Sequence, residues 1–353
     1  MRVFTALVSV AILVASIGCA TEEGSSTSEA DIGTRPPKQW TPSAKKAGNL
    51  RIATYNIRNF PKDVMGAPDG GADGGAAEEP DLDPDTIVRR QTDTDLAMAV
   101  EILDKLDFDV LAVQEINDTQ AFEDLLGRLG NKNGHRYQAV FSTEWPHPQH
   151  TGIVVRTDRA RIESPKVHAE IATRPTMRAG LSARIVSTKQ GGIDFGMLVL
   201  HLASGDGSGR MKLRAEQATF AAKVVAERKR ELGDEDFVVV GDYNTARQDQ
   251  EMPSFDTVMA SSESGLTRQQ NDSACTTYYT KGKSPLLEPS WIDHVYLASF
   301  AERDTTVPIV SGAHCAERSC QAFESSSAES GTSYWGVSDH CPVYFEVADQ
   351  DRD

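Results

Sequence analysis

Polar side chains stand at the ends of several apolar segments of this sequence, where a buried core would normally exclude them. Asp339 and His340 are adjacent and run directly into the apolar segment 341–345. Glu115 follows the apolar run VLAVQ, and an unpaired glutamate is seldom buried. The other members of this set are Asn56, His201, Asp242, Asn244 and Asp293. Such a set predicts one site, built where the ends of strands converge.

The chemistry open to this set is hydrolysis assisted by a metal ion. Carboxylates and an amide oxygen suit a hard cation such as Mg²⁺, with Mn²⁺ or Ca²⁺ as alternatives. Two histidines can act as general base and general acid. Covalent catalysis is disfavoured, because the chain has no Gly-x-Ser-x-Gly motif and its cysteines have no base partner. We therefore predict metal-assisted attack of water on a phosphate ester.

Apolar periodicity identifies the elements that must position these residues. Strands are predicted at 50–57, 108–116, 137–142, 151–156, 180–186, 194–202, 236–244, 290–300 and 341–348, and helices within 89–107 and 209–232. The strands between 137 and 202 are too closely spaced for intervening helices, which predicts antiparallel pairing. Strands with some crossing helices favour an α/β sandwich of two mixed sheets over a Rossmann fold or a TIM barrel.

The N-terminal segment is typical of an exported protein. One cation and an apolar run predict a signal peptide at residues 1–18. Gly18 and Cys19 resemble a bacterial lipoprotein cleavage box with Cys19 as the lipidated residue, although Ser16 stands where leucine is usual. Residues 19–48 are polar and rich in Ser, Thr and Pro, which predicts a flexible tether. We expect either a lipoprotein anchored to the outer membrane or a secreted protein.

Four cysteines remain after Cys19, and an even number in an exported chain suggests two disulfides. Cys315 and Cys320 are close enough in sequence to close a small loop, which pairs Cys275 with Cys341. A zinc site is the alternative, but no Cys-x2-Cys spacing supports it.

Residues 62–86 form an acidic insertion rich in Gly, Asp and Pro that has no core-forming content. This composition predicts a long mobile loop. The spacing of its acidic residues also suggests a calcium loop, but the bidentate glutamate of an EF-hand is missing.

Overall composition excludes some classes of protein. Hydrophobic residues make up 39% of the chain and charged residues 25%, which predicts a folded core. The formal charge of −16 becomes −17 when Arg2 leaves with the signal peptide. This charge argues against a protein that holds nucleic acid on a broad basic surface, but not against an enzyme that contacts a phosphodiester through a metal.

Six segments, in the order TYNIRNF, LAVQEI, LHLAS, GDYN, WIDHVYL and SDHCPV, resemble the signature blocks of the endonuclease/exonuclease/phosphatase superfamily. The pancreatic-type deoxyribonucleases are the branch they resemble most. The resemblance implies a four-layer α/β sandwich with two mixed, largely antiparallel central sheets, occupying residues 49–348 before a short tail at 349–353. It also implies a site at one edge of these sheets.

The resemblance implies a role for each site residue. Glu115 would be the main metal ligand, supported by Asn56 and Asp339. His340 would be the general base, oriented by Asp293, and His201 would protonate the leaving oxygen. Asp242 and Asn244 would position water and the scissile phosphate, and Arg178 matches a family position near the phosphate. Arg58 and Arg178 are also the basic side chains nearest the proposed site, so we expect both to bind substrate phosphates.

Two positions need separate comment. Deoxyribonuclease relatives support the acid histidine with a glutamate where this chain has Gln149, and an amide stabilises a charged His201 less well. His294 follows Asp293 in a predicted strand, so it should point to the opposite face and lie outside the site.

The resemblance sets the chemistry and leaves the substrate open. Nonspecific cleavage of DNA is the favoured activity, with no stable protein partner expected; RNA cleavage, abasic-site repair and inositol-phosphate hydrolysis are further candidates. A sphingomyelinase-type lipid phosphodiesterase is the main alternative, with Trp145, Tyr334 and Trp335 as residues that could enter a membrane. A non-catalytic surface binding protein is the alternative from another class.

Overall fold

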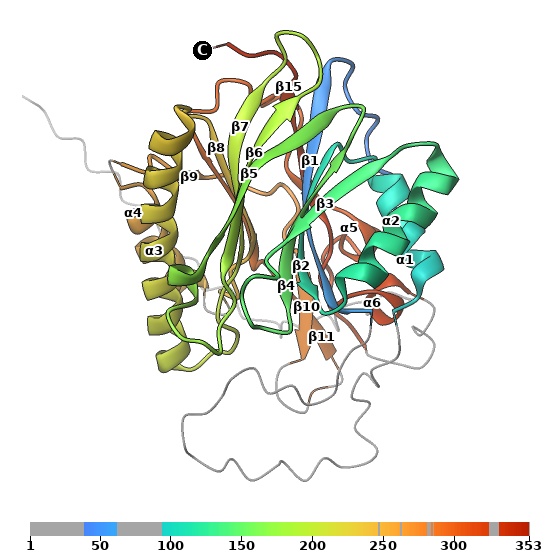
Figure 1. The fold of residues 1–353 in the computed structure, drawn as a ribbon. Helices are drawn as coiled ribbons and strands as arrows, with labels where there is room; N and C mark the ends of the chain where they lie inside the picture. Colours follow the sequence, from blue (N-terminus) through green and yellow to red (C-terminus); the bar gives the residue numbers. More distant parts are fainter. Residues whose placement is uncertain are drawn as a thin grey trace, which may run out of the picture. The chain divides into compact units, whose positions relative to one another are not determined.

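Two six-stranded sheets lie face to face in the centre of the protein (Figure 1). The structure is a computed structural model, and it describes residues 39–61, 94–245, 248–261, 263–280, 284, 286–324 and 332–352. The first sheet has the order β13 (Val310–Ser311), β15 (Val343–Ala348), β1 (Asn49–Phe60), β2 (Val110–Ile116), β4 (His150–Arg156), β3 (Tyr137–Phe141). The second has the order β5 (Ala160–His168), β6 (Gly180–Ser187), β7 (Asp194–His201), β8 (Phe237–Asp242), β12 (Asp293–Ala298), β9 (Thr267–Arg268).

Helices cover the outer face of each sheet. Figure 1 shows α1 (Leu96–Leu106) and α2 (Thr119–Asn133) beside the first sheet, and α3 (Ser208–Leu232) and α4 (Gln248–Met259) beside the second. Only the β1–β2 and β7–β8 pairs of these two sheets are parallel among the described strand pairs. This arrangement confirms the predicted four-layer sandwich with two mixed, largely antiparallel sheets.

Smaller elements lie beside this sandwich. A three-stranded sheet has the order β10 (Thr277–Thr280), β11 (Leu286–Ser290), β14 (Phe323–Glu324). Three short helical segments complete the described elements: η1 (Ala169–Ala172), α5 (Ala313–Glu317) and α6 (Ser333–Gly336).

The alternation of side chains along each strand determines which ones meet between the sheets. In β1, Leu50 and Ile52 pack into the layer between the sheets, whereas Ala53 and Tyr55 pack under α1 and α2. Because alternation continues along the strand, Asn56 faces the second sheet. The same period carries a polar residue inward at the end of β7 and β8, after inward-facing Val199 and Val240, and at the start of β12, before inward-facing Val295.

The disulfide pairing predicted from the sequence is wrong. The bonds join Cys275 to Cys320 and Cys315 to Cys341. Cys315 lies in α5, whose turn directs its side chain into the core next to Cys341, while Cys320 follows that helix and reaches the segment before β10. Cys315 and Cys320 are close in sequence but do not pair, because the helix between them directs their side chains to different places.

The predicted signal peptide at 1–18, the lipidated Cys19 and the insertion at 62–86 lie outside the described residues. The last part of the predicted tether, residues 39–48, packs against the sandwich instead of forming a loose linker. Trp40 is buried beside Tyr344, and the Lys45 ammonium group contacts the buried carboxylate of Asp109 at 3.0 Å. No helix in the described part of the chain is long and apolar enough to cross a bilayer.

A buried ion pair joins the two helices on the second sheet. Both side chains, Arg214 in α3 and Glu251 in α4, are almost fully buried, and their two contacts measure 2.7 and 2.8 Å. Arg214 also donates to the carbonyls of Ala203 and Gly205, in the loop that follows β7. This pair therefore holds α3, α4 and that loop together.

Removing one partner should be costly, because the other charge would remain buried without its counter-ion. We expect Arg214→Met to lower the free energy of unfolding by about 3–5 kcal/mol. The matched control is Arg161→Met, which removes an exposed pair with Glu163 and should cost less than about 1 kcal/mol. Denaturant unfolding followed by circular dichroism measures both, and similar losses in the two variants would contradict this assignment.

Candidate active site

Strand register brings three of the predicted site residues together. His201 at the end of β7 is paired with Asp242 at the end of β8, and Asp242 is paired with Asp293 at the start of β12. The parallel strands end, and the antiparallel strand begins, at the same edge of the second sheet. One imidazole and two carboxylates therefore lie in a row across three neighbouring strands.

The amide of Asn56 connects this row to the first sheet. Its Nδ2 donates to Asp242 Oδ2 and to Glu115 Oε1, both at 3.0 Å. Its Oδ1 accepts from the backbone N–H of Arg58 at 3.0 Å. Asn56 therefore links the carboxylates of Glu115 and Asp242 through Nδ2. Binding of a metal by its Oδ1 stays a prediction.

Glu115 reaches the site through an irregular backbone. It has φ +64°, and the pairing of β2 with β4 shifts register between Val113 and Ile116. A left-handed residue interrupts the alternation of the strand, so a side chain that would otherwise face the helices turns toward the site. Its Oε2 accepts from the backbone N–H of Asn59 at 3.0 Å, which fixes the second oxygen.

His340 lies against Asp293, the residue that the family resemblance pairs with it. Its Nδ1 lies 2.9 Å from Asp293 Oδ2, and its Nε2 lies 3.7 Å from Asp242 Oδ2. Burial lowers the pKa of His340, but the carboxylates of Asp293 and Asp242 more than offset it and raise the pKa to about 10. The imidazole thus presents Nε2 to the site while Nδ1 is held from behind.

His201 approaches the same carboxylate from the other side. Its Nε2 lies 3.6 Å from Asp242 Oδ2 and 3.5 Å from Glu115 Oε1. Arg178 Nη2 lies 2.9 Å from the same nitrogen and donates to the carbonyl of Leu202 at 2.7 Å. Burial, and then the charge of Arg178, hold the pKa of His201 well below its usual value, so this imidazole is neutral with Nε2 as an acceptor.

Asn244 and the pair Arg58–Asp339 form the rim of the site. Asn244 is left-handed at φ +52°; its N–H donates to Asp242 Oδ1 and its Nδ2 donates to the carbonyl of Leu202. Asp339 Oδ2 lies 3.3 Å from Arg58 Nη1, and both side chains are about a quarter exposed, at 26% and 22%. All ten predicted catalytic, metal-binding and substrate-binding residues therefore lie in one region, whereas their individual roles stay predictions.

The donor set fits a divalent cation. Burial raises the pKa of Glu115, and it raises the pKa of Asp242 to about 7, with the Asp293 charge adding to the effect. These carboxylates are buried away from water, and a buried carboxylate is stable as a charged group when it is paired or binds a metal. Ligand atoms of Glu115, His201 and Asp242 lie within 4.8 Å of one another, and carboxylate oxygens are preferred by hard cations.

Three other sequence expectations have clear outcomes. Gln149 donates to Asn59 Oδ1 at 2.7 Å and makes no hydrogen bond with His201, whose Nδ1 has no partner among the described residues. His294 lies outside the site, as expected, with Nε2 3.0 Å from Thr245 Oγ1. Trp145 donates to the carbonyl of Met177 and packs into a small apolar cluster.

Ser338 and Asn59 are site residues to which the sequence analysis gave no role. Ser338 Oγ donates to the carbonyl of Asn56 at 2.7 Å and accepts from the N–H of His340 at 3.1 Å, so it joins the loop of His340 to β1. Asn59 holds Glu115 through its backbone, at φ +48°. Both residues lie inside motifs that the sequence displays, TYNIRNF and SDHCPV, which is the signal that could have identified them.

Comparison with known proteins agrees with this geometry. The model of the endonuclease/exonuclease/phosphatase family matches residues 53–340. The chain belongs to this family. Its members are hydrolases that act on phosphate esters and generally depend on a divalent metal. Among curated protein sequences, none matches the chain.

Solved structures of family members share the fold at low sequence identity. The human Nocturnin catalytic domain with bound sulfate is 18% identical, with a TM-score of 0.54, over 90% of this chain and 100% of that one. TDP2 of D. rerio, complexed with a single-strand DNA product, is 16% identical, with a TM-score of 0.52, over 84% and 98%. A family protein from Bacteroides thetaiotaomicron is 18% identical, with a TM-score of 0.50, over 88% and 98%.

Gly241 is required for the register that aligns His201 with Asp242. It has φ +139°, and a Cβ there would lie 2.0 Å from the carbonyl oxygen of Leu200 on β7. We expect Gly241→Ala to push the two strands apart, so that thermal stability and hydrolytic activity fall together. Gly127→Ala is the matched control, because a Cβ there meets nothing within 4 Å and should stabilise α2. A Gly241→Ala protein with wild-type melting temperature and activity would contradict this account of the site.

Proposed function

We propose that this protein is an exported, metal-dependent phosphodiesterase whose preferred substrate is DNA, cleaved internally with little sequence preference. The observation that carries the proposal is the placement of two imidazoles around one carboxylate. The Nε2 atoms of His201 and His340 lie 3.6 and 3.7 Å from Asp242 Oδ2, on opposite sides of it. A base and an acid on two sides of one centre suit a reaction that adds water and expels an alcohol oxygen.

His340 is the proposed general base. Asp293 fixes its Nδ1 and leaves Nε2 facing the site. The carboxylates raise the pKa of His340 to about 10, so a bound cation would have to offset their charge before Nε2 can take a proton from the attacking water. Asp242 and Asn244 hold that water and the scissile phosphate in line with it. Preorganised positioning of this kind removes much of the entropic barrier to attack.

His201 is the proposed group that donates a proton to the leaving oxygen. Its Nε2 accepts from Arg178 and carries no proton of its own, so the guanidinium must exchange the imidazole for a phosphate oxygen when substrate binds, and Nε2 must take up a proton from solvent before it can protonate the leaving oxygen. The negative charge of the bound phosphate favours this uptake. Arginine is well suited to this exchange, because its planar donors match the oxygens of a phosphate. Arg58, which pairs with Asp339 at the rim, is the second proposed phosphate contact.

Glu115, with Asp339 and Asn56, is the proposed ligand set of the cation. A bound Mg²⁺ would supply Lewis-acid stabilisation of the negative charge that develops on the phosphate. The residues themselves hold Glu115 in place from both of its oxygens, through Asn56 Nδ2 and the N–H of Asn59. Mn²⁺ is the expected substitute.

The preference for DNA rests on charge and on the proposed location. An exported enzyme meets polymers outside the cell rather than intracellular repair intermediates, and the two disulfides are compatible with such a location. A chain with a formal charge of −16 cannot hold DNA by a broad basic surface. We therefore expect the divalent cation to serve both the chemistry and the approach of the polymer.

The lipid alternative is weakened by the aromatic residues that suggested it. Trp145 is anchored on Met177, and Tyr334 is 5% exposed in a cluster with Phe323 and both disulfides. Trp335 packs against the same cluster. Side chains that pack in this way stabilise the loops that carry them and are not exposed for insertion into a membrane.

A substrate panel tests the proposed function. The purified full chain is assayed with supercoiled plasmid, RNA, sphingomyelin micelles, inositol phosphates and bis(4-nitrophenyl) phosphate, with Mg²⁺ or with EDTA. We expect plasmid nicking and phosphodiester hydrolysis that disappear in EDTA and in the folded Glu115→Gln variant. Rapid turnover of sphingomyelin beside intact plasmid would replace the nuclease proposal with the lipid one, and full activity with verified metal removal would reject the mechanism.

The two histidines should respond differently to the leaving group. His340→Ala should lower kcat by roughly 10²–10⁴-fold on every substrate, because no base then activates water. His201→Ala should cost much less on bis(4-nitrophenyl) phosphate than on DNA, because nitrophenolate leaves without protonation. Single-turnover rates on both substrates measure this difference, and equal losses for His201→Ala on the two would remove it from the proposed role.

A further inference from the structure

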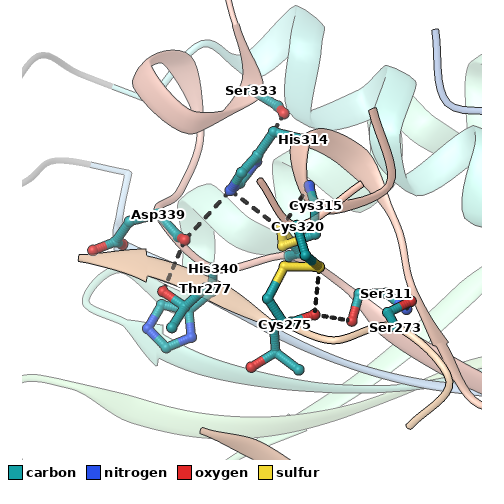
Figure 2. The surroundings of a disulfide bond; sticks show 12 residues. Ser273, Cys275, Thr277, Ser311, His314, Cys315, Cys320, Ser333, Asp339 and His340 are labelled. Atoms are coloured by element: carbon teal, nitrogen blue, oxygen red, sulfur yellow. Dashed lines mark hydrogen bonds between the residues drawn. A yellow bond between two sulfur atoms is a disulfide. The ribbon is translucent and has the colours of Figure 1, made fainter. Parts of the chain in front are cut away.

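The segment that carries Asp339 and His340 is held by its backbone from outside the two central sheets. The carbonyl oxygen of Asp339 accepts from Thr277 Oγ1 at 2.9 Å and from the N–H of Tyr278 at 3.1 Å, and His314 Nε2 lies 3.4 Å from it (Figure 2). Two of these groups belong to β10 of the small sheet and the third to α5. The carbonyl between the two site residues is thus surrounded by three polar groups.

Cys341 fixes the other side of His340. Its N–H donates to the carbonyl of Thr276 at 2.8 Å, and its sulfur is bonded to Cys315 in α5. The N–H of Cys315 also donates to Cys341 Sγ at 3.2 Å. Both sulfurs are fully buried, so this covalent connection is one residue away from the proposed base.

The imidazole of His340 depends on this support. Among the described residues its ring contacts the carboxylates of Asp293 and Asp242, and both belong to the second sheet. His340 is not in a strand of either central sheet, because β15 begins only at Val343. The register of these sheets therefore cannot place it, and its bridge to Thr277 in β10 must do so together with its neighbours in the chain.

The second disulfide has a different relation to the site. Cys275 and Cys320 join the segment before β10 to the turn after α5. The carbonyl of Cys275 also accepts from Ser311 Oγ at 2.7 Å, and Figure 2 shows this contact beside the disulfide. The backbone of Cys275 is therefore held without its sulfur, and this disulfide has no direct contact with Asp339 or His340 in the described structure.

We propose that the Cys315–Cys341 disulfide and Thr277 are positioning elements for catalysis, which fix Asp339 and His340 relative to Asp293 and Glu115. This inference rests on the proposed function of the same site. A displacement of a base by about 1 Å can lower turnover by about 10²-fold, with little effect on substrate binding. The loss should therefore appear in kcat, and in the metal concentration needed for activity, rather than in KM.

Paired cysteine variants test the disulfide. We expect Cys315→Ser/Cys341→Ser to lower kcat on bis(4-nitrophenyl) phosphate by at least about tenfold with KM within about twofold. Cys275→Ser/Cys320→Ser should keep kcat within about twofold of wild type. The Cys275–Cys320 disulfide closes a loop of 45 residues and the Cys315–Cys341 disulfide one of 26, so the control variant should lose at least as much stability. Equal losses of kcat in the two folded variants, or none in the first, would overturn the proposal.

Thr277 provides a test in which both disulfides are intact. Thr277→Val removes the hydroxyl that donates to the Asp339 carbonyl, and we expect kcat to fall several-fold and the activating Mn²⁺ concentration to rise. Thr277→Ser restores the donor and should return both values to within about twofold of wild type. If the Val and Ser variants behave alike, Thr277 has no positioning role.

Hydrogen exchange separates failure of this inference from failure of the proposed function. The amide of Cys341 is protected by the Thr276 carbonyl, so a peptide spanning 336–343 reports the segment directly. We expect faster exchange there in Cys315→Ser/Cys341→Ser than in Cys275→Ser/Cys320→Ser, whether or not any phosphate ester is hydrolysed. A wild type inactive on every substrate would reject the function alone, whereas unchanged exchange in both variants would reject the positioning role.

Discussion

The hydrogen bonds of one amide connect the two central sheets at the edge where the site lies. Asn56 Nδ2 donates to Glu115 on its own sheet and to Asp242 on the other, both at 3.0 Å. Because Asp242 is paired with His201 and Asp293 through strand register, the position of this amide relates the metal-binding and proton-transfer parts of the site. The layer between the sheets is otherwise mostly apolar, apart from polar residues such as the hydrogen-bonded Thr54 and Gln114. The amide of Asn56 is therefore a directional contact in a core that is held mainly by non-directional packing.

The carboxylates buried beside this amide lower the stability of the folded protein. Burial raises the pKa of Glu115 and, to about 7, that of Asp242, so the folded protein keeps charges that water would solvate better. Non-glycine residues in the left-handed region add backbone strain at Arg58, Glu115 and Asn244. The apolar layers on both sides of each sheet supply the stability that lets these unfavourable features persist.

The sequence predicts those features of the fold and the site that depend on the pattern of residues close together in the chain. The alternation within strands and the order of the motifs were enough to predict the sandwich and the set of polar residues at its edge. Helix α2 was missed although Asp118 caps its start, Gly134 caps its end and its buried residues have helical spacing. Disulfide partners, the support of Glu115 by Asn59 and the contact of Gln149 with Asn59 depend on side-chain direction after folding, which spacing along the chain does not determine.

The site residues differ in how they are held, and this difference explains where the cysteines lie. His201 and Asp242 end their strands, and Asn56 lies in β1 at the last pair before the register with β2 shifts, so strand register fixes all three. Asp339 and His340 precede the last strand, in a segment that no described strand pair of the central sheets includes and that an isolated bridge joins to Thr277. The four described cysteines fall in the segment 275–341 around them. Covalent bonds are thus concentrated where hydrogen-bonded strands are short and the apolar cluster is small. If His340 is the base, as proposed, disulfides in this segment keep it in place without a larger core.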